Sequence, residues 1–187
     1  MATTVTKPEF DQARQFIASD IEREIQLVRG QDLWWKKVAR KIWGVRPGGG
    51  NFLAALGLLC YTEFAGRIKC DDFSEGNSRA CFDDFFSDLG PEYAQLLGSC
   101  AVYKDLRCGL AHEYAVKNSC DIAMLEGGRQ AGVQWTGTKY VFVVESYWRD
   151  FRNAFDRLGQ QKFGIPARQP NRPLQPAGVT RSQHARG

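Results

Sequence analysis

The sequence has few of the residues that build a structural zinc site. Histidine occurs only twice, as His112 and His184, and the six cysteines include no C-x-x-C pair. Structural zinc sites typically use cysteine and histidine ligands in closely spaced pairs of this kind. We therefore expect neither a bound metal nor another cofactor.

Long hydrophobic runs are also missing. The longest apolar run, Phe52–Cys60, is about half of the roughly 18 residues that a membrane-spanning helix requires. The N-terminal segment does not show the basic stretch followed by an apolar run that marks a secretory signal. We expect a cytoplasmic protein that does not contact a membrane and whose cysteines are free thiols.

An excess of basic residues is confined to the C-terminal end. The formal net charge is +4, but Lys162 and four arginines lie within residues 162–187, which contain no acidic residue. Subtracting these five from the 25 basic residues leaves 20 against 21 acidic ones, a net charge of about −1 for residues 1–161. This balance excludes a uniformly basic DNA-binding domain. We expect one folded domain over residues 1–161 and a disordered basic tail, rich in proline, glutamine and arginine, over residues 162–187.

Apolar residues recur every three or four positions through most of the chain, which is typical of amphipathic helices. Between residues 120 and 144, short apolar runs separated by glycines favour strands instead. The fold class predicted from this pattern is mainly α, a helical bundle with a small antiparallel β-hairpin or meander before the last helix. The expected helices cover residues 8–29, 33–43, 52–69, 78–89, 91–114 (as one or two helices) and 144–159, and the expected strands cover residues 122–126, 133–135 and 140–144.

The expected helix at residues 52–69 is nearly all apolar in its first half, so it should lie in the core or at a subunit interface. Asn51 is its expected N-cap. Glu63 falls within the same helix, where burial of a lone carboxylate is costly. We therefore expect Glu63 to have a cation or hydrogen-bond donors as partners.

An aromatic and basic patch lies at residues 34–43, where Trp34, Trp35 and Trp43 accompany four basic residues. The interpretation we favour is a partly buried amphipathic helix with solvated lysines. A surface that binds the RNA backbone is the alternative.

The segment YKDLRCGLAHEY, residues 103–114, is the strongest candidate for a functional site. It carries Arg107 and, five residues later, His112, the one histidine outside the expected tail. On an ideal α-helix these side chains would point roughly 140° apart and lie ~7.5 Å apart along the axis. They can then flank one groove, and a bend at Gly109 would bring them closer. Gly109 also indicates close approach by another helix or chain, since glycine is unfavourable inside a helix.

Arginine and histidine have complementary uses at a phosphodiester. Arginine is permanently charged and forks onto phosphate oxygens, and histidine gives or takes a proton near neutral pH. RNA cleavage needs only deprotonation of the 2′-hydroxyl, protonation of the leaving 5′-oxygen and stabilisation of the charged intermediate. One histidine does not easily perform both transfers, but a symmetric dimer would place two Arg107 and His112 pairs across one cleft. Tyr103, Lys104 and Tyr114 are candidates for ribose or phosphate contact, with packing as the alternative for each. The alternative for Arg107 is an ion pair with Glu63 or Asp105, and for His112 a structural role.

The Arg-x4-His motif in this segment, preceded by the apolar stretch NFLAALGLLCYTEFAGR, resembles the HEPN superfamily (higher eukaryotes and prokaryotes nucleotide-binding domain), and above all its small stand-alone bacterial members. The resemblance covers roughly residues 8–160. It implies a helical bundle, a homodimer formed through the motif-bearing helices, and metal-independent RNA cleavage by Arg107 and His112. Glu63 would match an acidic position that supports the site in some members.

Cys108 is a departure from this family pattern, because active members often carry a polar residue such as asparagine directly after the arginine. A thiol donates only a weak hydrogen bond. The alternative prediction is therefore a catalytically inactive dimer that uses the same fold to bind RNA, a nucleotide or a protein partner.

Overall fold

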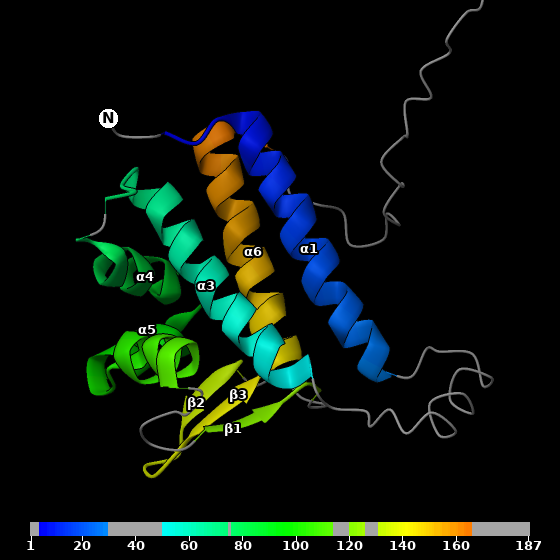
Figure 1. Cartoon of the computed structure of the whole chain (residues 1–187). Coiled ribbons are helices and arrows are strands. Elements are labelled where there is room, and N and C mark those ends of the chain that lie inside the picture. Colours follow the sequence, from blue (N-terminus) through cyan, green and yellow to red (C-terminus); the bar gives the residue numbers. More distant parts are fainter. Residues whose placement is uncertain (1–3, 30–49, 75, 114–119, 126–130, 166–187) are drawn as a thin grey trace, which may run out of the picture.

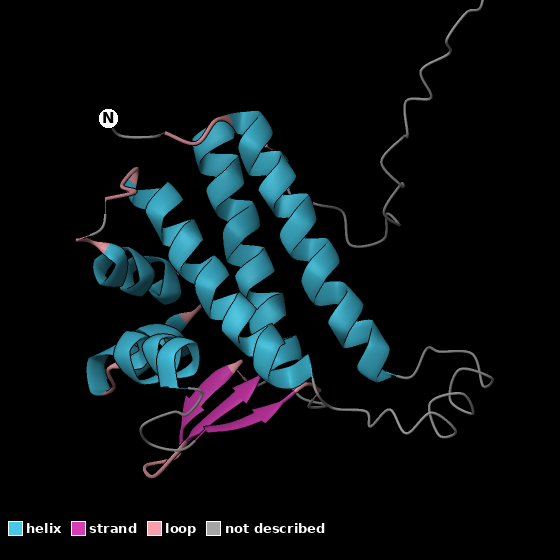
Figure 2. Cartoon of the chain, in the orientation of Figure 1, coloured by secondary structure: helices cyan, strands magenta, loops and turns pink. Residues whose placement is uncertain are grey.

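The structure, a computed structural model, describes residues 4–29, 50–74, 76–113, 120–125 and 131–165, with only the backbone of His112 and Glu113. The described chain is mostly helical, with a small three-stranded sheet before the last helix, which confirms the predicted fold class (Figure 2). The expected helix at residues 33–43 lies outside the described residues. No helix among those that are described is long and apolar enough to cross a membrane.

Three long helices lie side by side and carry the fold: α1 (Lys7–Arg29), α3 (Gly50–Cys70) and α6 (Val144–Phe163) (Figure 1). The shorter helices α4 (Ser78–Ser87) and α5 (Pro91–Ser99) lie on the side of α3 that faces away from α1, and the sheet lies at one end. The expected apolar face of α1 is buried at Phe10, Ile17, Ala18, Ile21 and Ile25, whereas Val28 near the end of the helix is exposed. Burial of each large side chain of this kind contributes about 1.5–3 kcal/mol, which holds α1 against the bundle.

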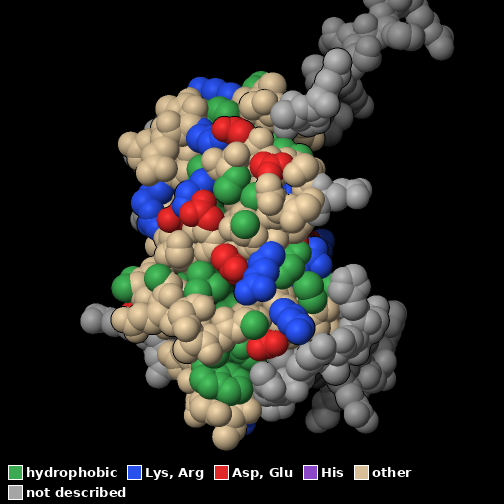
Figure 3. All heavy atoms as spheres, turned by 90° about the vertical axis from the view of Figure 1, so that its left-hand side faces the viewer, with side chains coloured by type: hydrophobic (Ala, Val, Ile, Leu, Met, Phe, Trp, Pro, Cys, Tyr) green, Lys and Arg blue, Asp and Glu red, His purple; other side chains and the backbone are tan. Residues whose placement is uncertain are grey.

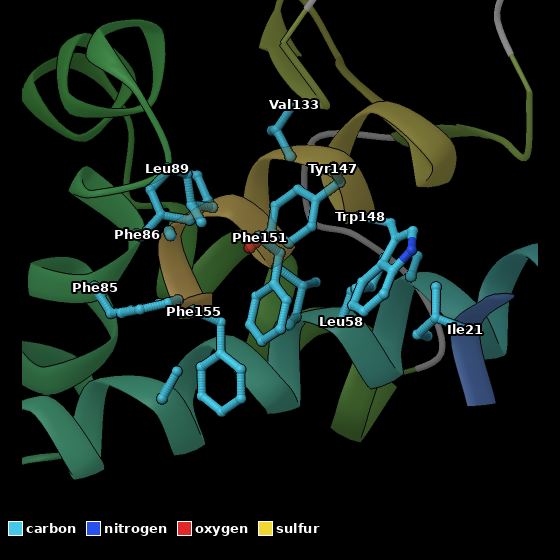
Figure 4. Close-up of a cluster of buried hydrophobic side chains, with 14 of the residues drawn as sticks. Ile21, Leu58, Phe85, Phe86, Leu89, Val133, Tyr147, Trp148, Phe151 and Phe155 are labelled. Carbon is cyan, nitrogen blue, oxygen red and sulfur yellow. The ribbon is translucent and has the colours of Figure 1, made fainter. Parts of the chain in front are cut away.

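The centre of the core is an aromatic cluster on α6 (Figure 4). Phe151 and Phe155 of α6 are buried beside Phe85 of α4, with ring centroids 5.8 Å and 6.4 Å from the Phe85 ring. Phe10 of α1 stacks on Phe155 at 4.6 Å. These edge-to-face and stacked contacts join three helices that are far apart in the sequence, so they fix where α1 and α4 lie relative to α6.

Helices α3 and α4 approach each other closely at Gly66. A Cβ atom added there would lie 2.0 Å from the carbonyl oxygen of Cys81, so only glycine allows this packing. The approach brings the first turn of α4, at Ser78, next to the last turns of α3. The position of Ser78 beside Arg67 of α3 depends on this contact.

Asn51 does not act as the expected N-cap of α3. The helix already includes Gly50, and the Asn51 side chain instead donates from Nδ2 to the carbonyl oxygen of Ile122 at 3.5 Å. The side chain thus ties the start of α3 to β1 (Cys120–Ala123). The Asn51 side chain therefore binds the distant Ile122 instead of a backbone N–H at the start of its own helix.

The sheet has the order β1-β3-β2, with β3 (Tyr140–Val143) in the middle. Strand β2 (Val133–Trp135) pairs with β3 antiparallel, as expected for a hairpin. Strand β1 pairs with β3 in parallel, which differs from a meander, because the chain passes through β2 on the far side of β3 before it returns. The sheet is therefore mixed rather than wholly antiparallel, and its first strand lies at Cys120–Ala123 instead of residues 122–126.

The expected boundary between domain and tail at residue 161 is corrected by the structure. Helix α6 continues to Phe163, Lys162 forms an ion pair with Asp71 at 2.6 Å, and Gly164 ends the helix in a left-handed conformation. Ile165 is buried in the core. The folded part therefore includes residues 162–165, because apolar packing continues beyond the point where the composition changes. Residues 166–187 of the expected tail lie outside the described part of the chain.

Candidate functional site

Glu63 is the centre of the candidate site. It lies on α3 with 8% of its surface exposed, and its two carboxylate oxygens have different partners. Oε1 accepts hydrogen bonds from Nε and Nη2 of Arg67 at 3.3 Å and 3.2 Å. Oε2 lies 2.7 Å from Nε of Arg107 and accepts a hydrogen bond from the hydroxyl of Tyr103 at 3.5 Å. The predicted need of Glu63 for a cation is confirmed, and one carboxylate between two guanidinium groups leaves a formal charge of +1.

The ion pair of Arg107 with Glu63 is made through Nε. The 2.7 Å contact with Glu63 is an ion pair rather than an aligned hydrogen bond, since the buried Nε–H does not point along it. The guanidinium carbon lies 5.9 Å from the centre of the Tyr103 ring, and the side chain is 21% exposed. Within the described part of the chain, no hydrogen bond occupies Nη1 or Nη2 of Arg107. These two nitrogens therefore form a pair of hydrogen-bond donors (the fork of Arg107) that can bind two oxygens of one anion.

The electrostatics of the cluster keep Arg107 charged and the side chains of Cys60 and Tyr103 neutral. Burial opposes the charge on Arg107, but Glu63 and the nearby Cys60 and Tyr103 outweigh it and raise the pKa of Arg107. Burial also raises the pKa of the Cys60 thiol, which Arg107 lowers only in part. Burial and the charge of Glu63 raise the pKa of Tyr103. Cys60 is therefore a poor nucleophile near neutral pH, and the chemistry of the cluster is that of a fixed cation.

Arg67 is a site residue that the sequence analysis missed. Besides Glu63, it contacts the Ser78 hydroxyl at the start of α4 and donates from Nη1 to the Ser74 carbonyl oxygen at 3.3 Å. The spacing of Glu63 and Arg67, one turn apart on a helix, is a signal that could have identified this pair. The serines gave no such signal, because their position depends on the packing of α4 against α3.

The motif segment forms η1 (Tyr103–Glu113), a π-helix rather than the expected α-helix. In a π-helix, backbone hydrogen bonds join residues that are five apart in the sequence. The backbones of Arg107 and His112 therefore lie about one turn apart on the same side of η1. The expected separation of roughly 140° applied to an α-helix and is corrected. Buried Leu106 and Leu110 pack η1 into the core, and the hydroxyl of Tyr140 on β3 donates to Asp105 at 2.8 Å.

The other predicted site residues differ in what the structure shows of them. Tyr103 is half-buried, and its ring meets that of Phe82 edge-on at 5.3 Å, so it packs as well as donating to Glu63. Lys104 is exposed, and Cys108 is half-buried with a free thiol. The side chain of His112 and the whole of Tyr114 lie outside the described residues.

The surface beside the site is not uniformly basic. Figure 3, which looks at the side of the molecule that carries α4 and α5, shows Lys and Arg side chains interspersed with Asp and Glu. Arg79, for example, pairs with Asp83 on α4 at 3.4 Å. Binding of an anion here would therefore depend on local groups such as Arg107 rather than on a broad positive field.

Comparisons of the chain with models of protein families, with curated proteins and with solved structures find no match in any of the three.

Proposed function

We propose that this chain binds RNA through Arg107 and that, as a HEPN-like homodimer, it cleaves RNA without a metal ion by the combined action of Arg107 and His112. The observation that carries the proposal is the state of Arg107, whose Nε is held by the buried Glu63 while Nη1 and Nη2 have no hydrogen bond within the described residues. A guanidinium held in this way is oriented before its ligand arrives. Two parallel N–H groups match two oxygens of one phosphate.

The role of Arg107 in such a reaction is electrostatic. When the 2′-oxygen attacks the phosphorus, negative charge builds up on the non-bridging oxygens of the phosphate. A guanidinium that stays charged at every accessible pH stabilises that charge more than it stabilises the substrate. The pKa of Arg107 is raised further by Glu63 and its neighbours, although burial opposes this.

The role of His112 is proton transfer. Its position in the last turn of η1, about one π turn after Arg107, agrees with both residues acting on one phosphate. The reaction removes the proton of the 2′-hydroxyl, forms a bond from the 2′-oxygen to phosphorus and breaks the bond to the 5′-oxygen, which takes up a proton. The products are a cyclic phosphate and a free 5′-hydroxyl. Two imidazoles, one from each subunit, would serve as the base and the acid.

A second candidate function is binding of RNA or a nucleotide without cleavage. The observation that favours it is Cys108, which directly follows Arg107 and supplies only a weak hydrogen-bond donor at a half-buried position. In this case the fork of Arg107 would bind the phosphate and His112 would play no part in catalysis.

The experiment that tests the proposal measures cleavage and binding separately. Cleavage of a mixed-sequence single-stranded RNA is followed in EDTA for the wild type, His112→Ala and Arg107→Met. The matched controls are His184→Ala, at the only other histidine, and Arg79→Met, at an exposed arginine of α4. We expect both site variants to lose cleavage by roughly a hundredfold or more and both controls to retain it.

Binding separates the two functions. If Arg107→Met weakens RNA binding but wild type and His112→Ala show equal cleavage, the protein is a binding module without catalysis. If Arg107→Met binds and cleaves as the wild type does, the proposed function is wrong in both forms. Light scattering of the wild type tests the homodimer, which a monomeric mass would rule out.

A further inference from the structure

The two oxygens of Glu63 are divided between two arginines. Arg67 takes Oε1 with two N–H groups, and Arg107 is left with Oε2, which its Nε approaches at 2.7 Å without a hydrogen bond from Nη1 or Nη2 among the described residues. An arginine and a carboxylate generally prefer the two-point arrangement with parallel N–H···O bonds. Arg107 therefore has a weaker contact with Glu63 than the chemistry of the pair allows.

Arg67 is in turn anchored by two groups other than Glu63. Its Nη1 donates to the Ser74 carbonyl oxygen at 3.3 Å, and its Nη2 also contacts the Ser78 hydroxyl. Both anchors belong to the connection into α4 and its first residue, which the glycine contact between α3 and α4 holds in place. Oε1 of Glu63 is thus held by an arginine that is itself anchored at the start of α4.

The consequence for Arg107 follows from the burial of Glu63. With 8% of its surface exposed, Glu63 has little access to water, so an oxygen released by Arg67 has to find a protein donor. The nearest cation that remains is Arg107, 2.7 Å from the other oxygen. Rotation of the carboxylate would then engage an Nη nitrogen of Arg107 and close the two-point pair. That nitrogen would no longer be available to a phosphate.

We propose that Arg67 is a positioning residue, which keeps Glu63 from forming a two-point pair with Arg107 and so leaves the Nη groups of Arg107 for the RNA phosphate. This inference rests on the proposed function, in which Arg107 binds phosphate. It assigns Arg67 no contact with RNA. Its effect passes through Glu63 alone.

The test is a double-mutant cycle of Arg67→Lys and Glu63→Gln in the full chain. Lysine keeps the positive charge but has no planar fork, so it does not hold Oε1 and both anchors together. Binding of a short mixed-sequence single-stranded RNA is measured by fluorescence anisotropy at one fixed salt concentration. We expect Arg67→Lys to weaken binding roughly tenfold when Glu63 is present, which is the loss of about one charge-assisted hydrogen bond. With Gln at position 63, the same change should alter binding by less than about twofold, because no carboxylate remains to occupy Arg107.

Three outcomes overturn the inference. Unchanged RNA binding by Arg67→Lys would show that the fork of Arg67 is irrelevant. Equal weakening in both backgrounds would mean that Arg67 contacts RNA itself or only supports the fold. Arg107→Met distinguishes this failure from failure of the proposed function: if it binds RNA as the wild type does, the proposed function is wrong, and if it alone loses binding, only the role of Arg67 is wrong.

A second variant keeps the test valid if Arg67→Lys does not fold, which thermal unfolding of each variant will show. Ser78→Ala removes one anchor of Arg67 and retains every charge of the cluster. We expect it to weaken binding in the same direction by a smaller factor, about twofold to threefold, and only while Glu63 is present. An unchanged affinity in Ser78→Ala together with an unfolded Arg67→Lys would also overturn the inference.

Discussion

Removal of both arginines from Glu63 should cost far more stability than the two single removals suggest. In Arg67→Met or Arg107→Met, Glu63 keeps one guanidinium partner, so we expect each single variant to lose about 1 kcal/mol of the free energy of unfolding. The side chains involved are 20%, 21% and 10% exposed for Arg67, Arg107 and Glu63, so solvent screens these contacts only in part. Methionine retains most of the apolar stem of arginine, so the loss reports mainly on the charge.

The double variant leaves the carboxylate of Glu63 with only the Tyr103 hydroxyl at 3.5 Å among its described partners. An uncompensated buried charge typically costs roughly 3–5 kcal/mol, against about 2 kcal/mol if the single effects simply added. The assay is equilibrium unfolding in urea at neutral pH, with the slope of the transition compared between variants. Addition of Glu63→Gln to the double variant removes the charge and should recover most of the excess loss.

Additive losses would refute this reasoning. They would mean that water reaches Glu63 in spite of its 8% exposure, or that the two arginines do not share one carboxylate. A triple variant no more stable than the double variant would likewise show that the charge of Glu63 is not the source of the cost.

Three further predictions concern residues outside the Glu63 cluster: Gly66, Tyr93 and Asp72. Gly66→Ala should lower the free energy of unfolding by about 1–3 kcal/mol, because the added Cβ would lie 2.0 Å from a carbonyl oxygen of α4. Gly98→Ala is the control and should be neutral or stabilising, because an added Cβ there has nothing within 4 Å. Equal effects of the two substitutions in urea unfolding would contradict the close packing at Gly66. Tyr93→Phe should lower the free energy of unfolding by about 1–3 kcal/mol. The Tyr93 hydroxyl donates a hydrogen bond to Asp150 of α6 and accepts one from the backbone N–H of Gly132, both at 2.7 Å. A loss too small to measure by urea unfolding would count against these bonds. The pKa of Asp72 is lowered from 3.8 to about 2, first by the side-chain hydrogen bond from Asn77, so its contribution to stability is complete above pH 4 and is lost as the pH falls towards 2. The stability difference between wild type and Asp72→Asn should therefore shrink over that window in urea unfolding, and a difference that stays constant from pH 5 to about 2 would be inconsistent with this shift.

The elements of the fold could be predicted from the sequence to a large extent, because their signal is local. The apolar period of α1, with Phe10 and Ile25 at its two ends, follows from burial of one face of a single helix. The hairpin of β2 and β3 follows from short apolar runs around a glycine turn. The need of Glu63 for a partner such as a cation also follows from its position in the sequence, since a carboxylate within an apolar helix has to be paired.

Features that depend on contacts between distant residues were decided only by the tertiary structure. That Arg107 reaches Glu63 depends on how η1 packs against α3, and Arg67 is held by Ser78 only after α4 has packed against α3. The parallel pairing of β1 with β3 depends on where the chain returns to the sheet. The π-helical backbone of η1 differs from an α-helix by one residue in each hydrogen-bonded ring. The periodicity of the sequence does not distinguish the two, and the packing of Leu106 and Leu110 together with the bond from Tyr140 accompanies the π form. Periodicity therefore determined the helices, and packing determined which charged groups meet at Arg107.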